Sequence, residues 1–182
     1  MNLRDKLRMA STAPKKPAAT PACTSCWEKQ TLRPLTEFPG AFSLQASTLQ
    51  LMEKESLPSR LDPRRILYLD TETTGLGGGS GTVAFQMGVG QLTDQGFIVT
   101  QLVMRDYPEE IYLLKRLNSF LENCDALCTF NGRSFDLPLL RTRFLMNKLS
   151  PSLLDKPHID LLHIVRRLWK LRLGRCNLSR ME

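Results

Sequence analysis

The sequence predicts an α/β domain in which three antiparallel strands are followed by a parallel strand, with helices flanking the mixed sheet. Apolar and β-rich runs at residues 66–69, 82–93 and 96–104 predict the first three strands, because they have strand length and are separated by glycine-rich or turn sequences. A helix that opens at Pro108 precedes the fourth strand, residues 126–130. The order of these elements also permits other α/β plans.

The composition favours a globular domain with an anionic partner. The 182 residues are 42% hydrophobic, which is enough for a buried core, and they carry a net charge of +7 with a pI of about 9.4. No apolar run is long enough to span a membrane, and no secretory signal is recognisable. Five scattered cysteines fit a reducing compartment, so we expect a cytoplasmic protein.

The chain divides into three regions by composition. Residues 1–30 are rich in Pro, Ala and Lys and predict a flexible arm, residues 31–62 predict a partly ordered N-terminal extension, and residues 63–182 hold the main domain. Cys23 and Cys26 form a C-x-x-C pair at the end of the arm. No second pair and no paired histidines follow at a spacing usable for zinc, so two reduced thiols are the favoured interpretation.

Two carboxylates, Asp70 and Glu72, end the first apolar run. Side chains alternate along a strand, so the two point to the same face with their Cα atoms roughly 6–7 Å apart. Like charges at the end of a buried strand repel each other, and a divalent cation between them relieves the repulsion. In the simpler alternative, Asp70 caps the strand end and Glu72 faces water. The buried approach favours the metal site, because an unpaired acidic pair is costly there.

The sequence Leu-Asp-Thr-Glu-Thr-Thr-Gly-Leu resembles the first motif of the DEDD (DnaQ-like) 3′-to-5′ exonucleases, which have the ribonuclease H-like fold. The resemblance implies that Asp70 and Glu72 bind two ions, and their hard oxygen ligands suit Mg²⁺ or Mn²⁺. It also implies that four residues hold the terminal nucleotide of the substrate: Thr73, Thr74, Gly75 and Leu76.

The glycine-rich run at residues 75–81 permits a second interpretation as a phosphate-binding loop. The P-loop pattern fails because no Gly-Lys-Ser/Thr follows, and the dinucleotide fingerprint requires a helix next. The following residues are β-rich, which favours a simple reversal between two antiparallel strands. A nucleotide-cofactor enzyme remains the alternative only if this run opens a helix.

A second polar segment follows the fourth strand, where open α/β sheets place their sites. Asn131-Gly132 predicts a turn, and Asp136 lies at the start of a predicted helix, where a plain N-cap would stabilise by about 1 kcal/mol. The pattern Asn-x-x-x-Phe-Asp-x-Pro is similar to the second motif of the DEDD exonucleases. By this resemblance Asp136 completes the metal site, and Asn131 fixes the loop or touches the substrate. Phe130 and Arg133 then contact the adjoining nucleotide or phosphate.

Apolar residues at helical spacing predict one buried face on each of three helices. The predicted buried residues are Ile111, Leu114, Leu117 and Leu121 on the first helix, Leu137, Leu140, Phe144 and Leu145 on the second, and Leu161, Ile164 and Leu168 on the third.

His158, Asp160 and His163 form a candidate ligand cluster before the third helix. The favoured alternative is that Asp160 is the N-cap of this helix and that His163 lies on its exposed side. The segment His-Ile-Asp-Leu-Leu, followed by Arg-Arg-Leu-Trp, closely resembles the YprB-type ribonuclease H-like proteins of bacteria. This resemblance covers residues 63–182 continuously.

The C-terminal part of the chain is strongly basic. Between Arg141 and Arg180, ten Lys or Arg residues stand against two acids, Asp155 and Asp160. A basic helix is often only a solvated face, but this excess lies beside a predicted phosphodiesterase site and favours phosphate contacts, including contacts from Arg166 and Arg167. We therefore expect single-stranded nucleic acid, DNA or RNA, as the partner.

The leading interpretation is a metal-dependent 3′-to-5′ exonuclease, and the alternative is a non-catalytic nucleic-acid-binding module with the same fold. DEDD enzymes take a fourth carboxylate from a later helix, with a His or Tyr just before it as general base. The chain stops at Glu182, too close to the preceding helix to supply that carboxylate. We expect a C-terminally incomplete domain, lacking its fifth core strand or the covering helix, which binds metal weakly and is close to inactive.

Overall fold

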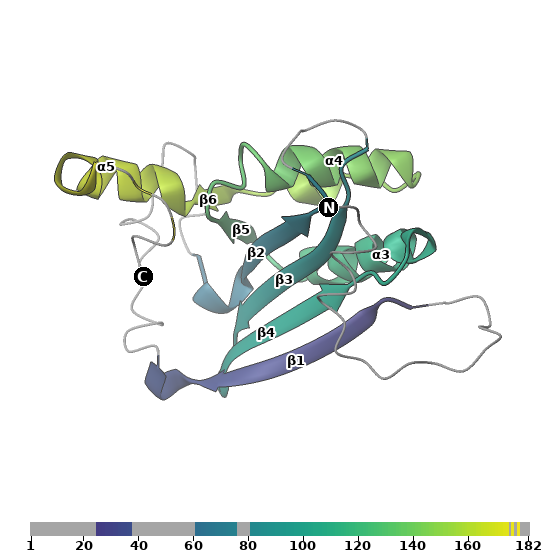
Figure 1. Cartoon of the computed structure of the whole chain (residues 1–182). Coiled ribbons are helices and arrows are strands. Elements are labelled where there is room, and N and C mark those ends of the chain that lie inside the picture. The colour runs from purple at the N-terminus through teal and green to yellow at the C-terminus, as the bar shows by residue number, and fades with distance from the viewer. Residues whose placement is uncertain (1–24, 38–60, 76–80, 175, 177, 179–182) are drawn as a thin grey trace.

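The computed structural model describes residues 25–37, 61–75, 81–174, 176 and 178. Within these ranges a six-stranded sheet has the strand order β1-β4-β3-β2-β5-β6 (Figure 1). The strands are β1 (Trp27–Pro34), β2 (Ile66–Thr73), β3 (Ala84–Leu92), β4 (Gly96–Val103), β5 (Ala126–Thr129) and β6 (His158–Asp160).

Helices and short 3-10 turns accompany the sheet. None of the helices in the described part of the chain is long and apolar enough to cross a membrane. The helices are α3 (Glu110–Leu121), α4 (Asp136–Met146) and α5 (Leu161–Leu173), with 3-10 turns η1 (Leu35–Glu37), η3 (Pro63–Arg65), η4 (Tyr107–Glu109) and η5 (Ser152–Asp155).

The predicted mixed sheet is confirmed. Strands β2, β3 and β4 are antiparallel neighbours, whereas β5 is parallel to β2 and β6 is parallel to β5. Because Tyr68 of β2 lies beside Cys128 of β5, the carboxyl ends of both strands reach the same edge of the sheet. This edge receives Asp70 and Glu72 from β2 and the loop that leads from β5 to α4.

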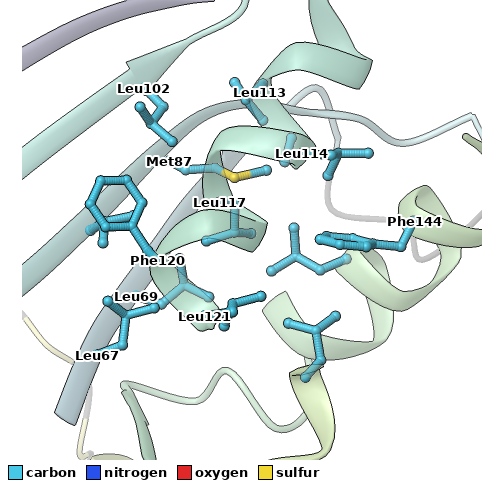
Figure 2. Close-up of a cluster of buried hydrophobic side chains, with 14 of the residues drawn as sticks. Leu67, Leu69, Met87, Leu102, Leu113, Leu114, Leu117, Phe120, Leu121 and Phe144 are labelled. Carbon is cyan, nitrogen blue, oxygen red and sulfur yellow. The ribbon is translucent and has the colours of Figure 1, made fainter. Parts of the chain in front are cut away.

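The main core lies between the sheet and helices α3 and α4. Figure 2 shows Leu69 and Met87 of the sheet facing Leu117 and Leu121 of α3, with Phe144 of α4 at the side of the cluster. All five side chains are almost completely removed from water. Burying one such side chain is worth about 1.5–3 kcal/mol, so this layer fixes α3 and α4 on the sheet.

A buried ion pair joins the beginning of α3 to the second half of α4. The Arg143 guanidinium donates to both carboxylate oxygens of Glu110 at 2.5 and 2.6 Å, and Asn147 Nδ2 donates to Glu110 Oε2 at 2.8 Å. The Glu110 hydrogen bonds raise the pKa of Arg143 further. The pair explains one wrong prediction on α4: Arg143 takes the inward position together with Leu140, and Leu145 is 63% exposed.

The buried face predicted for α5 is also partly wrong. Leu162, Ile164 and Val165 are buried, whereas Leu161 and Leu168 are 36% and 46% exposed. Only the first turns of α5 pack on the sheet, and Figure 1 shows the rest of the helix extending away from it. On α3 the predicted face is confirmed for the three leucines, while Ile111 is half-buried.

Strand β1 is not predicted by the sequence, and it crosses the boundary expected between the arm (residues 1–30) and the extension. All of its side chains are exposed, so no apolar alternation marks it in the sequence. It joins the sheet through its backbone ladder with β4 and through Glu28, which accepts two hydrogen bonds of 2.8 Å from the Arg116 guanidinium of α3.

Strand β6 is likewise not predicted as a strand. Its three residues are too short to show a period, yet Leu127, Cys128 and Thr129 of β5 pair with them. We expected either the fifth core strand or its covering helix to be missing. The sheet does contain a strand next to β5, so the strand is present.

The reversal between β2 and β3 is confirmed as an antiparallel connection. Residues 76–80, including Leu76, lie outside the described part, but the element that follows them is strand β3. The nucleotide-cofactor alternative required a helix in this place and is wrong.

We predict that Leu117→Ala lowers the free energy of unfolding by about 2–5 kcal/mol, because it removes a fully buried side chain between α3 and the sheet. Chemical denaturation measures the change. The control is Leu145→Ala, which removes a leucine that is largely exposed and should change stability by less than about 0.5 kcal/mol. Equal losses for the two variants would contradict the described packing.

Candidate active site at the carboxyl edge of the sheet

The acidic residues of β2 stand where the strand leaves the core. Leu67 and Leu69 are buried, and Asp70 and Glu72, two positions apart, are exposed on one face of the strand. The predicted buried approach along β2 is therefore confirmed, whereas the role of the two exposed acids as metal ligands stays a prediction.

Asp136 is brought to this strand by Thr71. It is the first residue of α4 and is only 7% exposed. The Thr71 hydroxyl, which lies between the two acids in sequence, donates a hydrogen bond to Asp136 Oδ1. Residues 65 positions apart in the chain thus meet at the edge of the sheet.

The negative charge of Asp70 acts on the ionisation of Asp136. Burial raises the pKa of Asp136, hydrogen bonds from Thr71 oppose this effect, and the negative charge of Asp70 raises the pKa further. The pKa of Asp70 is raised as well, mainly by desolvation, although the residue is partly open to water. The site therefore holds two carboxylates whose ionised forms are disfavoured, which a cation between them would correct.

The convergence of all three acids stays a prediction. Among the described residues, no group of three or more His, Cys, Asp or Glu side chains is assembled closely enough to hold a metal ion. Asp136 feels the negative charge of Asp70, and Glu72 shares the strand face of Asp70. The donor set nevertheless fits a hard divalent cation, because it consists of carboxylate oxygens that repel one another.

The β5–α4 loop has a conformation that its sequence explains. Asn131 adopts a left-handed backbone with φ of 66°, which asparagine tolerates better than most residues. At Gly132 a Cβ atom would lie 2.4 Å from Thr129 Oγ1, so only glycine fits. The predicted Asn-Gly turn therefore has a definite steric cause.

Asp160 anchors this loop, a role that the sequence analysis missed. Its side chain is completely buried and accepts hydrogen bonds from the backbone N–H groups of Asn131 at 2.7 Å and Arg133 at 3.2 Å. It also accepts from Leu162 N at 3.1 Å, which confirms the predicted N-cap of α5. The loop contact depends on the pairing of β6 with β5, which no local pattern indicates.

The two histidines do not form a metal cluster with Asp160. His158 is buried, and its Nε2 is hydrogen-bonded to Thr129 Oγ1 at 2.9 Å, the same oxygen that accepts from Gly132 N at 3.0 Å. His163 lies on the exposed side of α5, as predicted. Both ends of β6 therefore contact this region: His158 bonds the side chain of Thr129, and Asp160 bonds the backbone of the loop.

Other predicted site residues fall near the same edge. Thr73 donates to the carbonyl of Gly75 at 2.8 Å, and Thr74 Oγ1 accepts from Val83 N at 3.1 Å. Phe130 is half-buried, and the Arg133 guanidinium donates to the His158 carbonyl at 3.3 Å. Thr73 and Thr74 directly follow Glu72 in sequence, and Phe130 and Arg133 lie in the loop that follows β5 at the same edge of the sheet. Their contacts with a nucleotide stay predictions.

Cys23 lies outside the described residues, so the C-x-x-C pair is seen only through Cys26. Cys26 is a half-buried free thiol, and burial is the largest of the effects that raise its pKa. It packs against the main core.

The sheet order, the acids on its central strand and the anchored β5–α4 loop define a ribonuclease H-like α/β domain. The family model of the RNase_H superfamily matches residues 67–182, and the chain belongs to this superfamily. The predicted family is confirmed. Membership of this superfamily supports a nuclease-type function for the domain.

The chain is also similar in sequence to a curated protein. The uncharacterized protein YprB of Bacillus subtilis (strain 168) is 38% identical over 120 residues, which is 64% of this chain and 28% of YprB. The chain thus spans less than a third of the length of this curated relative.

Two crystal structures of E. coli exonuclease I are also similar. One is a zinc-bound complex with single-stranded DNA, 18% identical, with a TM-score of 0.46 over 59% of this chain and 30% of that chain. The other is a complex with a dT13 oligonucleotide, 19% identical, with a TM-score of 0.46 over 62% of this chain and 31% of that chain.

We predict that Asp136→Asn stabilises the metal-free protein at neutral pH. A raised folded-state pKa means that the folded state binds the proton more tightly, so stability falls as pH rises from the unfolded-state pKa through the folded-state pKa. Asparagine removes the charge and keeps an oxygen for the Thr71 hydroxyl. Thermal unfolding in EDTA should show a higher Tm for the variant at about pH 8, with a smaller difference at about pH 4.

The control for this prediction is Asp94→Asn, because the Asp94 side chain is 81% exposed and pairs with Arg64 on the surface. Its effect on Tm should be small and should not grow with pH. An Asp136→Asn variant with unchanged or lower Tm above neutral pH would contradict the conclusion that the folded protein disfavours the ionised form of Asp136.

Proposed function

We propose that the domain is a divalent-metal-dependent exonuclease that hydrolyses single-stranded nucleic acid from its 3′ end. The observation that carries the proposal is the contact between Thr71 and Asp136, which brings the acid of α4 to the end of β2, the strand that carries Asp70 and Glu72. The raised pKa values of Asp136 and Asp70, both due mainly to burial, support a cation at this place. Superfamily membership supports the chemical class.

Each acid has a separate role in this proposal. Asp70 would bridge two Mg²⁺ or Mn²⁺ ions, Glu72 would bind one of them, and Asp136 would act directly or through a water. Two bound ions would supply an activated water and charge stabilisation for the leaving oxygen. Thr71 keeps the Asp136 carboxylate turned toward β2, so that its orientation does not depend on the ligand.

The nucleotide would be held by the segments on either side of the acids. Thr73, Thr74 and Gly75 continue directly from β2, and Leu76 follows them. Phe130 and Arg133 border the site from the β5–α4 loop, whose backbone Asp160 holds. A rigid loop lowers the conformational entropy lost when a nucleotide binds.

A second candidate function is a nucleic-acid-binding module without catalysis. The positions of both histidines of the chain favour it, because His158 is engaged with Thr129 and His163 lies on the exposed side of α5. Without a histidine at the acids, the proton transfer that the family pattern assigns to a general base would be slow.

We predict that the purified chain slowly shortens 5′-labelled single strands with Mn²⁺, and that EDTA and Asp70→Ala each abolish the reaction. Denaturing gels read the products, and a ladder that shortens from the 3′ end is expected. The matched control is Asp94→Ala, which changes an exposed acid in the turn between β3 and β4, at the opposite edge of the sheet.

Two results would change the conclusion. Binding of single strands without any Mn²⁺-dependent shortening would favour the binding module. Rapid turnover that Asp70→Ala abolishes would show that proton transfer in this domain does not need a histidine at the acids.

The basic face of α5 supplies a further prediction. Arg166 and Arg167 are both exposed, and a phosphate bound by each contributes to the dependence of affinity on salt. The double variant Arg166→Gln/Arg167→Gln should reduce the slope of log affinity against log salt by about 0.7–1 for each phosphate that is no longer neutralised. Fluorescence anisotropy in EDTA measures the slope, and an unchanged slope would identify α5 as a merely solvated face.

A further inference from the structure

A cleft of about 500 Å³ lies beside the candidate site. It runs between the first turns of α4 and the segment that leads from η5 into β6. Its charged lining consists of Arg133, Arg141 and Lys156, together with one acid, Asp155. The cleft therefore has an excess of two positive charges, and it attracts anions.

The cations of the cleft are positioned by fixed partners. Arg141 donates to Asp155 Oδ1 and, through its second terminal nitrogen, to the carbonyl of Leu154 at 3.3 Å. Lys156 donates to the carbonyl of Cys124 and lies close enough to Asp125 for its charge to lower the pKa of that carboxyl group. The two carbonyl contacts order the long side chains before a ligand arrives and do not need to break when it binds, so less side-chain entropy is lost on binding.

The acid of the cleft is held weakly. The side chains of Arg141 and Asp155 are 38% and 61% exposed, and an exposed pair of this kind is worth at most about 1 kcal/mol. A phosphate offers the guanidinium a bidentate, doubly accepting partner of the same charge type. Phosphate can therefore displace Asp155 from Arg141 at small cost.

The cleft continues from the candidate site along α4. Leu137, which lines it, directly follows Asp136 in sequence. From Asp136 to Arg141 the helix rises by about 7.5 Å, since each residue adds about 1.5 Å. A strand whose end lies at the acids would thus carry its next phosphates past Arg133 and Arg141 toward Lys156.

We propose that this cleft binds backbone phosphates of a single-stranded nucleic acid on the 5′ side of the terminal nucleotide, with Arg141 and Lys156 as the contacting cations. Asp155 acts as a built-in competitor that occupies Arg141 until the strand arrives. The direction of the strand rests on the proposed function, but phosphate binding in the cleft does not.

The test is binding of a short 5′-labelled single-stranded DNA, measured by fluorescence anisotropy in EDTA so that no cleavage occurs. Arg141→Gln and Lys156→Gln should each weaken binding about two- to fivefold, as one exposed charge contact does. Each should also lower the salt slope by about 0.7. Asp155→Asn should instead tighten binding, because it releases Arg141.

Arg141→Gln should lower the affinity for the strand and Asp155→Asn should raise it. These opposite changes in affinity distinguish a phosphate site from an ion pair that is only structural. If the pair only stabilised the fold, both variants would be neutral or would weaken binding together. The matched control is Asp94→Asn, which makes the same change in net charge and removes an exposed partner of Arg64, an arginine that also pairs with Asp62. Asp94 follows β3, three strand positions from β6 and thus about 14 Å away across the sheet.

The proposal is overturned if Asp155→Asn and Asp94→Asn change affinity equally, or if Arg141→Gln leaves both affinity and salt slope unchanged. Inorganic phosphate and a mononucleotide are also tested as competitors of the labelled strand. If, per phosphate, either competes as well as an unlabelled oligonucleotide does, the cleft is a pocket for small anions, and the proposed path of the strand is overturned. Binding is measured without metal, so the two proposals fail independently. If the cleft variants do not change affinity, the cleavage test still stands, and if no cleavage is seen, the changes in affinity still test the cleft. Thermal unfolding confirms that each variant is folded.

Discussion

The geometry of the candidate site depends on a buried carboxylate that touches no substrate. Asp160 is fully removed from water, which would be strongly unfavourable for a charge without partners. Three backbone N–H groups solvate it, two from the β5–α4 loop at Asn131 and Arg133 and one from Leu162 of α5. A single side chain thus fixes where β5 ends, how the loop turns and where α5 begins.

The loop positions the start of α4, and other contacts position the rest of the helix. Thr71 holds Asp136 at the first turn, while the Glu110–Arg143 pair holds the second half of α4 against α3. Phe144 adds the apolar contact between them. Since the two ends of α4 are attached to different elements, the carboxylate of Asp136 has little freedom relative to β2, which a preformed metal site requires.

Local patterns explain why part of this arrangement could be predicted from the sequence. Apolar runs and helical spacing located β2 to β5 and the helices, and strand alternation placed Asp70 and Glu72 on one face. β1 exposes every side chain and β6 has three residues, so neither has a period to detect. The loop contacts of Asp160 require the β5–β6 pairing, and the orientation of Leu145 follows from a long-range ion pair, so both depend on tertiary structure.

The polar partners of the candidate site differ from those of the neighbouring cleft: neutral donors bind the acid Asp136, whereas cations line the cleft. Asp136 is held by the Thr71 hydroxyl and by backbone groups, which fix its direction and add no positive charge. A guanidinium in that place would neutralise the carboxylate and compete with a metal ion. The cations gather instead in the neighbouring cleft, where Arg141 and Lys156 face solvent-accessible space. Neutral donors at the acids and cations one helical turn away suit a reaction in which a cation binds the scissile phosphate and the protein binds the phosphates beside it.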